Sequence, residues 1–159
     1  MSATAPEGSE AHALKCELAS EVLKSSGRIH LQVTGWSMLP TVWPGDTLTI
    51  ERSEMREVQE GDIVLFSRDR RFCVHRVVKK MRGNLAILTR GDAMPRSDAP
   101  VSDRDLLGKV VQIRRNSKCL KPHKSFGRVK RMLGMLVGSS MIAARVVVGV
   151  HGMRQPAPQ

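Results

Sequence analysis

The feature that most restricts the fold of this chain is a series of strand-like segments through its middle. In residues 28–34, the apolar Ile29, Leu31 and Val33 alternate with polar neighbours, which is the period-two pattern of a half-buried strand. Five further strand candidates are separated by clusters of Gly, Pro and Asp: Thr47 to Glu51, Ile63 to Ser67, Phe72 to Lys79, Asn84 to Thr89 and Gly108 to Arg114. Six strands in about 90 residues, with no helical stretch between them, predict a small, mainly β, antiparallel domain.

A short helix is expected before the first strand. From Glu10 to Ser25 the apolar residues Leu14, Leu18 and Val22 recur every four positions, and Gly27 follows as a candidate C-cap. This spacing predicts an amphipathic helix, preceded by a flexible lead over residues 1–9.

The cysteines and other ligand types give no sign of a cofactor. Three cysteines at wide spacing, Cys16, Cys73 and Cys119, do not make a disulfide framework and are expected to be reduced thiols. Cys73 and His75 are the one close pair of soft ligands, so a zinc site is not expected. The sequence also contains no P-loop and no dinucleotide fingerprint. We therefore expect neither a metal nor an organic cofactor.

The net charge of +11 is concentrated at the C-terminal end. Residues 1–110 contain 16 basic and 15 acidic residues, whereas residues 111–159 contain ten basic residues and no acidic one. Such a tail is typical of a contact with an anionic partner or membrane surface. Eight of the 18 residues from Arg114 to Arg131 are basic, but Phe126 is the one aromatic residue among them, so a platform for base stacking is missing. Nucleic acid is therefore the less favoured partner.

The segment from Met132 to Val150 is apolar, with Ser139, Ser140 and Arg145 as its polar side chains. As a helix it would be about 28 Å long at roughly 1.5 Å per residue, close to the thickness of a bilayer core. Three glycines and the central Arg145 weigh against insertion, so spanning, lying on and avoiding a membrane all remain open. The expected organisation is a lead and helix over 1–27, a β domain over 28–114, a basic linker over 115–131 and an apolar C-terminal helix over 132–153.

Two charge patterns bear on location. Residues 1–10 are small and acidic, unlike a secretory signal, which makes a cytosolic start the expectation. If residues 132–150 did span, six basic residues would flank them on the side of the β domain and Arg154 alone would follow. The positive-inside rule would then keep the β domain in the cytoplasm. We expect a cytoplasmic or cytoplasm-facing, membrane-associated protein.

Ser37 is the first candidate for a catalytic residue. It follows the first predicted strand directly and lies between Gly35 and Pro40, which restrict the backbone so that the hydroxyl can project clear of the sheet. A polar turn residue that caps a strand is the structural alternative.

Several short motifs occur in a fixed order around this serine: Ser37-Met38-Leu39-Pro40, Gly45-Asp46, Gly61-Asp62-Ile63-Val64, His75-Arg76-Val77-Val78, Gly91-Asp92 and Leu107-Gly108-Lys109-Val110. Over about residues 31–113 this order resembles the signal peptidase I superfamily of serine endopeptidases, which also includes self-cleaving LexA-type repressors. The resemblance implies the small β domain of that superfamily, with Ser37 as nucleophile. It also implies an extended polypeptide substrate, added as a strand at a sheet edge, with small residues before the cut and signal-peptide processing as the family role.

His75 matches the position at which bacterial members have a lysine, and this looks like the archaeal and endoplasmic-reticulum branch. A lysine must lose about three pKa units before it accepts a proton at neutral pH, whereas a free imidazole titrates near 6.5. The resemblance therefore makes His75 the general base. The alternative is a core histidine on the strand face that it shares with Cys73 and Val77.

The same branch has an acid in a Gly-Asp motif and a second Asp six positions later, which Asp92 and Asp98 match. The earlier doublets, Gly45-Asp46 and Gly61-Asp62, each precede a strand, so turn chemistry accounts for them. Gly91-Asp92 opens a polar loop instead, where catalytic side chains are common. We expect Asp92, with help from Asp98, to orient His75, although Ala93-Met94 departs from the asparagine usual in the family.

These residues predict a serine endopeptidase that works through an acyl-enzyme, with the backbone N–H of Ser37 as first oxyanion donor. Gly35 occupies the position at which many bacterial relatives supply a second donor, a serine hydroxyl. A LexA-type regulator is one alternative, although 27 residues before the first strand are too few for a helix-turn-helix domain. An inert binding module on the same fold, attached to a membrane by its tail, is the other.

Overall fold

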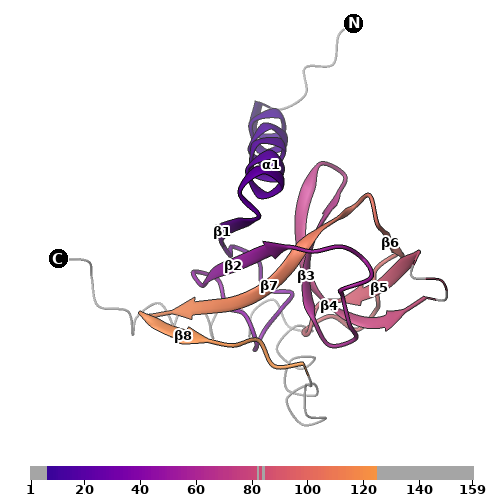
Figure 1. Cartoon of the computed structure of the whole chain (residues 1–159). Coiled ribbons are helices and arrows are strands. Elements are labelled where there is room, and N and C mark those ends of the chain that lie inside the picture. The colour runs from indigo at the N-terminus through magenta and orange to yellow at the C-terminus, as the bar shows by residue number, and fades with distance from the viewer. Residues whose placement is uncertain (1–6, 82, 84, 125–159) are drawn as a thin grey trace, which may run out of the picture.

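The computed structural model describes residues 7–81, 83 and 85–124, which form one helix and one antiparallel sheet (Figure 1). The strand order is β1-β2-β7-β3-β4-β5-β6, and β8 pairs with β7. The elements are α1 (Glu7–Ser26), β1 (Arg28–Gln32), β2 (Thr47–Arg52), β3 (Ile63–Arg68), β4 (Arg71–Lys80), β5 (Ala86–Arg90), β6 (Val101–Ser102), β7 (Leu106–Arg115) and β8 (Lys118–Leu120). The predicted mainly β, antiparallel domain with a short N-terminal helix is confirmed.

The six predicted strands correspond to β1, β2, β3, β4, β5 and β7, with ends shifted by at most two residues. The two shortest strands, β6 and β8, were not predicted because two or three residues carry no periodicity. Strand β8 lies in the range expected to be basic linker. A tight turn at Asn116 and Ser117, both with positive φ, folds it back on β7.

The core is built almost entirely from aliphatic side chains. One cluster lies on β1, β2, β3 and β7, where Leu48, Ile50 and Leu65 are fully buried and Leu23 of α1 packs against them. A second cluster gathers around Phe66 and Val77. Burial of this apolar surface is the main stabilising contribution to the sheet.

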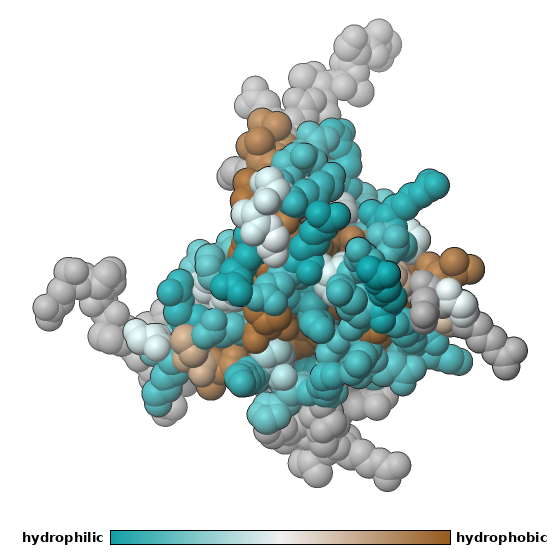
Figure 2. Space-filling model, in the orientation of Figure 1, coloured by the Kyte–Doolittle hydropathy of each residue, from teal (hydrophilic) through white to brown (hydrophobic). Residues whose placement is uncertain are grey.

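Helix α1 buries a different face from the one predicted. Leu14, Leu18 and Val22 are 57 %, 59 % and 51 % exposed, whereas Cys16 and Leu23 are buried. Residues four positions apart are not fully aligned on a helix of 3.6 residues per turn, so the predicted apolar stripe moves gradually around the helix. The helix contacts β1, β2 and β4 and extends away from the sheet, so apolar side chains remain on its surface (Figures 1 and 2).

The expected apolar C-terminal helix and segment 132–150 lie outside the described residues. In the part that is described, no helix has the length and apolar character needed to cross a membrane.

Candidate active site

Ser37 lies in the loop that connects β1 to β2, and the loop is closed at its neck by backbone hydrogen bonds. The Val33 N–H donates to the Asp46 carbonyl at 2.9 Å, and the Gly45 N–H donates to the Val33 carbonyl at 2.8 Å. Within the loop, the Leu39 N–H donates to the Trp36 carbonyl at 3.0 Å, which makes a tight turn around Ser37. The buried side chains of the loop anchor this turn in the core: Met38, Leu39 and Val42.

His75 lies on β4, with its ring between Ser37 and Asp98. The Ser37 hydroxyl oxygen is 2.9 Å from Nε2, and an Asp98 carboxylate oxygen is 2.7 Å from Nδ1. The side chains of His75 and Asp98 are 14 % and 22 % exposed, so their contact is largely shielded from water but still accessible to it. The structure thus brings together three residues that lie 38 and 23 positions apart in the sequence.

Thr89 of β5 holds Asp98 in place. Its hydroxyl donates to the Asp98 carboxylate at 2.6 Å, and its carbonyl accepts the Asp98 N–H at 2.8 Å. Thr89 is itself fully buried. Burial raises the pKa of Asp98, but hydrogen bonds from His75 and Thr89 and the nearby Arg68 charge outweigh it, so this pKa lies below its usual value. Asp98 therefore stays ionised, which suits an acceptor for the imidazole N–H.

Asp92 lies in a different position from the one expected. Both of its carboxylate oxygens accept hydrogen bonds from the Arg76 guanidinium at 2.8 Å, and one also accepts from the Thr41 hydroxyl. Asp92 is thus held by Arg76 and Thr41, whereas the carboxylate beside His75 is that of Asp98. The physical reason is the pleat of β4: successive side chains point to opposite faces, so His75 and Arg76 face different carboxylates.

Arg76 joins four parts of the chain. Besides Asp92, its guanidinium donates to the Gly61 carbonyl at 2.8 Å, to the His123 carbonyl at 2.6 Å and to the Thr41 hydroxyl at 3.3 Å. Its side chain is 7 % exposed. Sequence reasoning missed this role. The available signal was an arginine in the middle of a predicted strand, since a buried guanidinium needs an acid partner.

The loop that carries Asp92 packs directly on the loop that carries Ser37. The Ala93 N–H donates to the Ser37 carbonyl at 2.9 Å. A Cβ atom added to Gly91 would lie 2.5 Å from that carbonyl oxygen and 3.0 Å from the Ser37 Cβ. Glycine is therefore needed at position 91 because the backbones approach too closely for any side chain.

The two earlier Gly-Asp doublets have the turn structure expected of them. Gly45 and Gly61 both have φ of 91°. Asp46 accepts the Trp43 N–H at 2.8 Å, and Asp62 accepts the Gln59 N–H at 3.0 Å. These carboxylates stabilise their own turns, which distinguishes them from Asp98.

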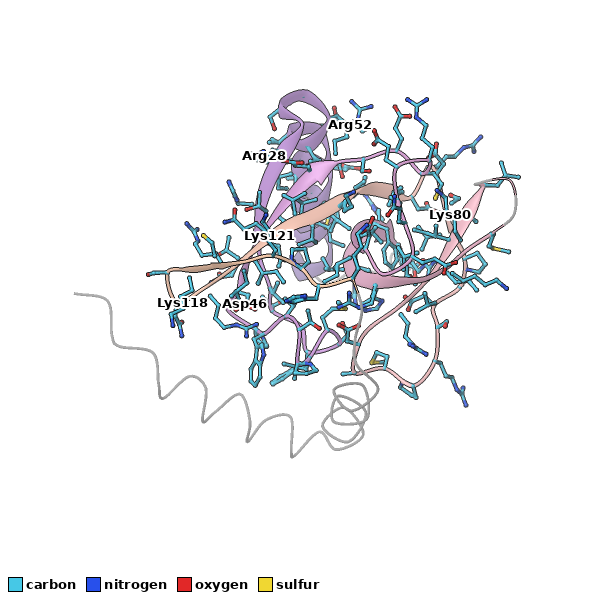
Figure 3. All side chains as sticks on the ribbon, turned by 60° about the horizontal axis from the view of Figure 1, so that its bottom comes forward. Arg28, Asp46, Arg52, Lys80, Lys118 and Lys121 are labelled. Atoms are coloured by element: carbon cyan, nitrogen blue, oxygen red, sulfur yellow. The ribbon has the colours of Figure 1, made fainter. Side chains whose placement is uncertain are left out.

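Other titratable groups lie outside this line of contacts. The Lys80 ammonium donates to the carbonyls of Arg56 and Val58, and Figure 3 shows Lys80 on the opposite side of the molecule from Asp46. Burial raises the pKa of the Cys73 thiol, and the Asp98 charge raises it further. Within the described residues, no group of three His, Cys, Asp or Glu side chains is placed to hold a metal ion.

Comparison with known proteins agrees with the fold. A family model described as Peptidase S24-like matches residues 1–111, which include Ser37, His75, Asp92 and Asp98. No curated protein matches the chain. The match covers well over half of the sequence and makes the chain a serine peptidase or LexA-like module in general terms. The chain thus belongs to the Peptidase S24-like family, within the superfamily of LexA-type and signal-peptidase-like serine peptidases.

Proposed function

We propose that this protein is a serine endopeptidase in which Ser37 is the nucleophile, His75 the general base and Asp98 the acid that orients the base. The observation that carries the proposal is the line of contacts from Ser37 Oγ to His75 Nε2 at 2.9 Å and from Nδ1 to Asp98 at 2.7 Å. A base and an orienting acid arranged in this way activate a serine hydroxyl. Histidine in this role is the arrangement of the archaeal and endoplasmic-reticulum branch.

The geometry requires one tautomer of His75. To accept the Ser37 O–H, Nε2 must carry a lone pair, so the ring proton lies on Nδ1. The Asp98 carboxylate accepts a hydrogen bond from this Nδ1–H group, and because the pKa of Asp98 is lowered the carboxylate is ionised at neutral pH. Asp98 then also stabilises the imidazolium formed during the reaction.

The reaction proceeds in two halves. Ser37 Oγ attacks the peptide carbonyl carbon while its proton moves to His75 Nε2, and a tetrahedral oxyanion forms. The C–N bond then breaks as Nε2 returns the proton to the leaving amine, which leaves an acyl ester on Ser37. Water, deprotonated by Nε2, attacks the ester, and collapse of the second tetrahedral intermediate releases the acid and returns the proton to Ser37.

The backbone N–H of Ser37 is the proposed oxyanion donor. Among the described residues, no group accepts a hydrogen bond from this N–H. The Ser37 carbonyl is fixed by the Ala93 N–H, so the local backbone is held before substrate arrives. A preorganised donor of this kind stabilises charge as it develops in the transition state.

The proposal is tested by incubating the full chain with a peptide library and identifying products by mass spectrometry. Ser37→Ala is expected to lower the rate by a factor on the order of 10⁴, while Ser53→Ala, at a surface serine that donates to Glu57, leaves it unchanged. Identical products from wild type and Ser37→Ala would refute the peptidase assignment. If the protein cleaves its own chain but none of the peptides, it is a self-cleaving regulator. If neither the chain nor any peptide is cleaved, it is an inert module.

A further inference from the structure

Two exposed apolar side chains adjoin the nucleophile and have no part in the proposed chemistry. Trp36 precedes Ser37 in the chain and is 41 % exposed. Met94, from the loop that packs on Ser37, is 44 % exposed. Large apolar groups that are exposed to water release that water when a partner covers them, which favours an apolar partner.

Met94 is placed close to the reacting atoms. Its Cγ lies 2.7 Å from the point at which a Gly91 Cβ would stand, and the Ser37 Cβ lies 3.0 Å from the same point. The Met94 Cγ and the Ser37 Cβ are therefore at most 5.7 Å apart, the sum of those two distances. A scissile carbonyl carbon approaches the serine oxygen to about 3 Å. The distance between the Met94 and Ser37 side chains is short enough for the Met94 side chain to contact a substrate residue next to the scissile bond.

The chemistry of this pair favours one class of substrate residue. Methionine is flexible and polarisable, so it adapts to linear, branched or aromatic apolar groups. The indole ring of Trp36 is a large, rigid apolar surface. Neither residue carries a charge, and the indole N–H of Trp36 is their one strong hydrogen-bonding group, so a charged side chain at this place would be desolvated with little compensation. The resemblance to signal peptidases implies small residues before the cut, which would leave Met94 and Trp36 uncovered.

We propose that Met94 and Trp36 form an apolar subsite that selects polypeptides with a large apolar residue, such as Leu, Met or Phe, on one side of the scissile bond. This inference rests on the proposed peptidase function. It extends that function by assigning a substrate class to two residues outside the Ser37, His75 and Asp98 line.

The test begins from a bond that the wild-type protein cleaves. The residue on each side of that bond is replaced in turn by Leu, Phe or Ser, and kcat/KM is measured for each peptide. At one of the two positions, the peptides with Leu or Phe are expected to have a kcat/KM about tenfold or more above that of the Ser peptide. This is the usual effect of a few methylene contacts. Met94→Ala is expected to reduce that ratio to about threefold or less.

A matched control separates the subsite from a general effect of removing methionine. Met81 is 40 % exposed and follows β4, six residues beyond His75, so it is similar in type and exposure but lies outside the site. Met81→Ala is expected to keep the wild-type preference. A wild type that does not distinguish Leu from Ser, or a Met94→Ala variant that keeps the full preference, overturns the subsite while leaving the peptidase function intact.

A binding measurement tests the subsite even if no peptide is cleaved. The Ser37→Ala protein is titrated calorimetrically with a Leu-rich peptide and its Ser-substituted counterpart, with and without Met94→Ala. Tighter binding of the Leu peptide that disappears with Met94→Ala supports the subsite, and equal binding of the two peptides overturns it. If Trp36→Ala and Met94→Ala instead weaken binding to anionic lipid vesicles and leave peptide preference unchanged, these residues contact a membrane and the proposal is wrong.

Discussion

Asp92 and Arg76 form a bidentate ion pair in which each carboxylate oxygen lies 2.8 Å from a guanidinium nitrogen. The two side chains are 5 % and 7 % exposed. Because Arg76 also holds the turn at Gly61 and the carbonyl of His123, the pair ties the Asp92 loop to the rest of the domain. Asp92 and Asp98 look alike in the sequence but have different contacts: Asp92 pairs with Arg76, and Asp98 with His75.

Asp92→Ala is expected to lower the free energy of unfolding by about 3–5 kcal/mol, because it leaves the Arg76 charge buried without its carboxylate. Denaturant titration of the purified variant measures this loss. The control is Glu51→Ala, which breaks an ion pair with Arg28 whose side chains are 41 % and 60 % exposed and which should cost about 0–1 kcal/mol. Equal losses in the two variants would show that the Asp92 pair has no special structural role.

Asp98→Asn is expected to lower kcat by a factor on the order of 10³–10⁴, because the amide no longer fixes the His75 tautomer. Steady-state kinetics on a cleaved peptide measures the effect, with Asp92→Asn as the paired variant. Asp92→Asn should lower stability more and kcat less than Asp98→Asn. The reverse pattern would return the orienting role to Asp92.

The lowered pKa of Asp98 also predicts a pH dependence of stability. A carboxyl whose folded-state pKa lies below the usual 3.8 stabilises the native state at higher pH and loses that contribution as pH falls through the folded value. The difference in unfolding free energy between wild type and Asp98→Asn should therefore shrink as the pH falls below about 4. Urea titrations at a series of pH values measure it, and a difference that stays constant down to pH 2.5 would contradict the assigned contacts.

Thr89 is expected to act as a positioning residue for Asp98. Thr89→Val keeps the shape but removes the hydroxyl that donates at 2.6 Å, so kcat should fall about tenfold with little change in KM. Thr89→Ser restores the donor and should recover most of the activity. If the Ser and Val variants give equal kcat values, the Thr89 hydroxyl does not position Asp98.

The fold was predictable where the sequence is periodic. Strand β1 carries its alternation of apolar and polar residues in the chain, whereas β8 depends on pairing with β7 and leaves no local signal. The helix was also predictable, but its buried face was not. The side chain that enters the core is Leu23, near the helix end that meets the sheet, and not the repeat begun by Leu14.

The candidate site was likewise predictable only in part. Ser37 and His75 stand in motifs whose order was readable, but Asp92 and Asp98 follow the same strand in one loop, and spacing alone does not say which of them faces the imidazole. That choice depends on Arg76, which points to the opposite face of β4 from His75 and requires a carboxylate there. Assigning one carboxylate to Arg76 and the other to His75 would have shown that Asp92 and Asp98 have different roles.

Two glycines beside Ser37 give opposite predictions. A Cβ at Gly91 would collide with the Ser37 carbonyl at 2.5 Å, whereas a Cβ at Gly35 would meet nothing within 4 Å. Gly91→Ala is expected to cost about 1–3 kcal/mol of stability from overpacking. It should also lower kcat about 100-fold by displacing the nucleophile. Gly35→Ala should change the unfolding free energy by less than about 1 kcal/mol and kcat by less than about threefold. Unfolding titrations and kinetics on the two variants decide the matter, since comparable activity in both would mean that the packing of the Asp92 loop on Ser37 does not position the hydroxyl.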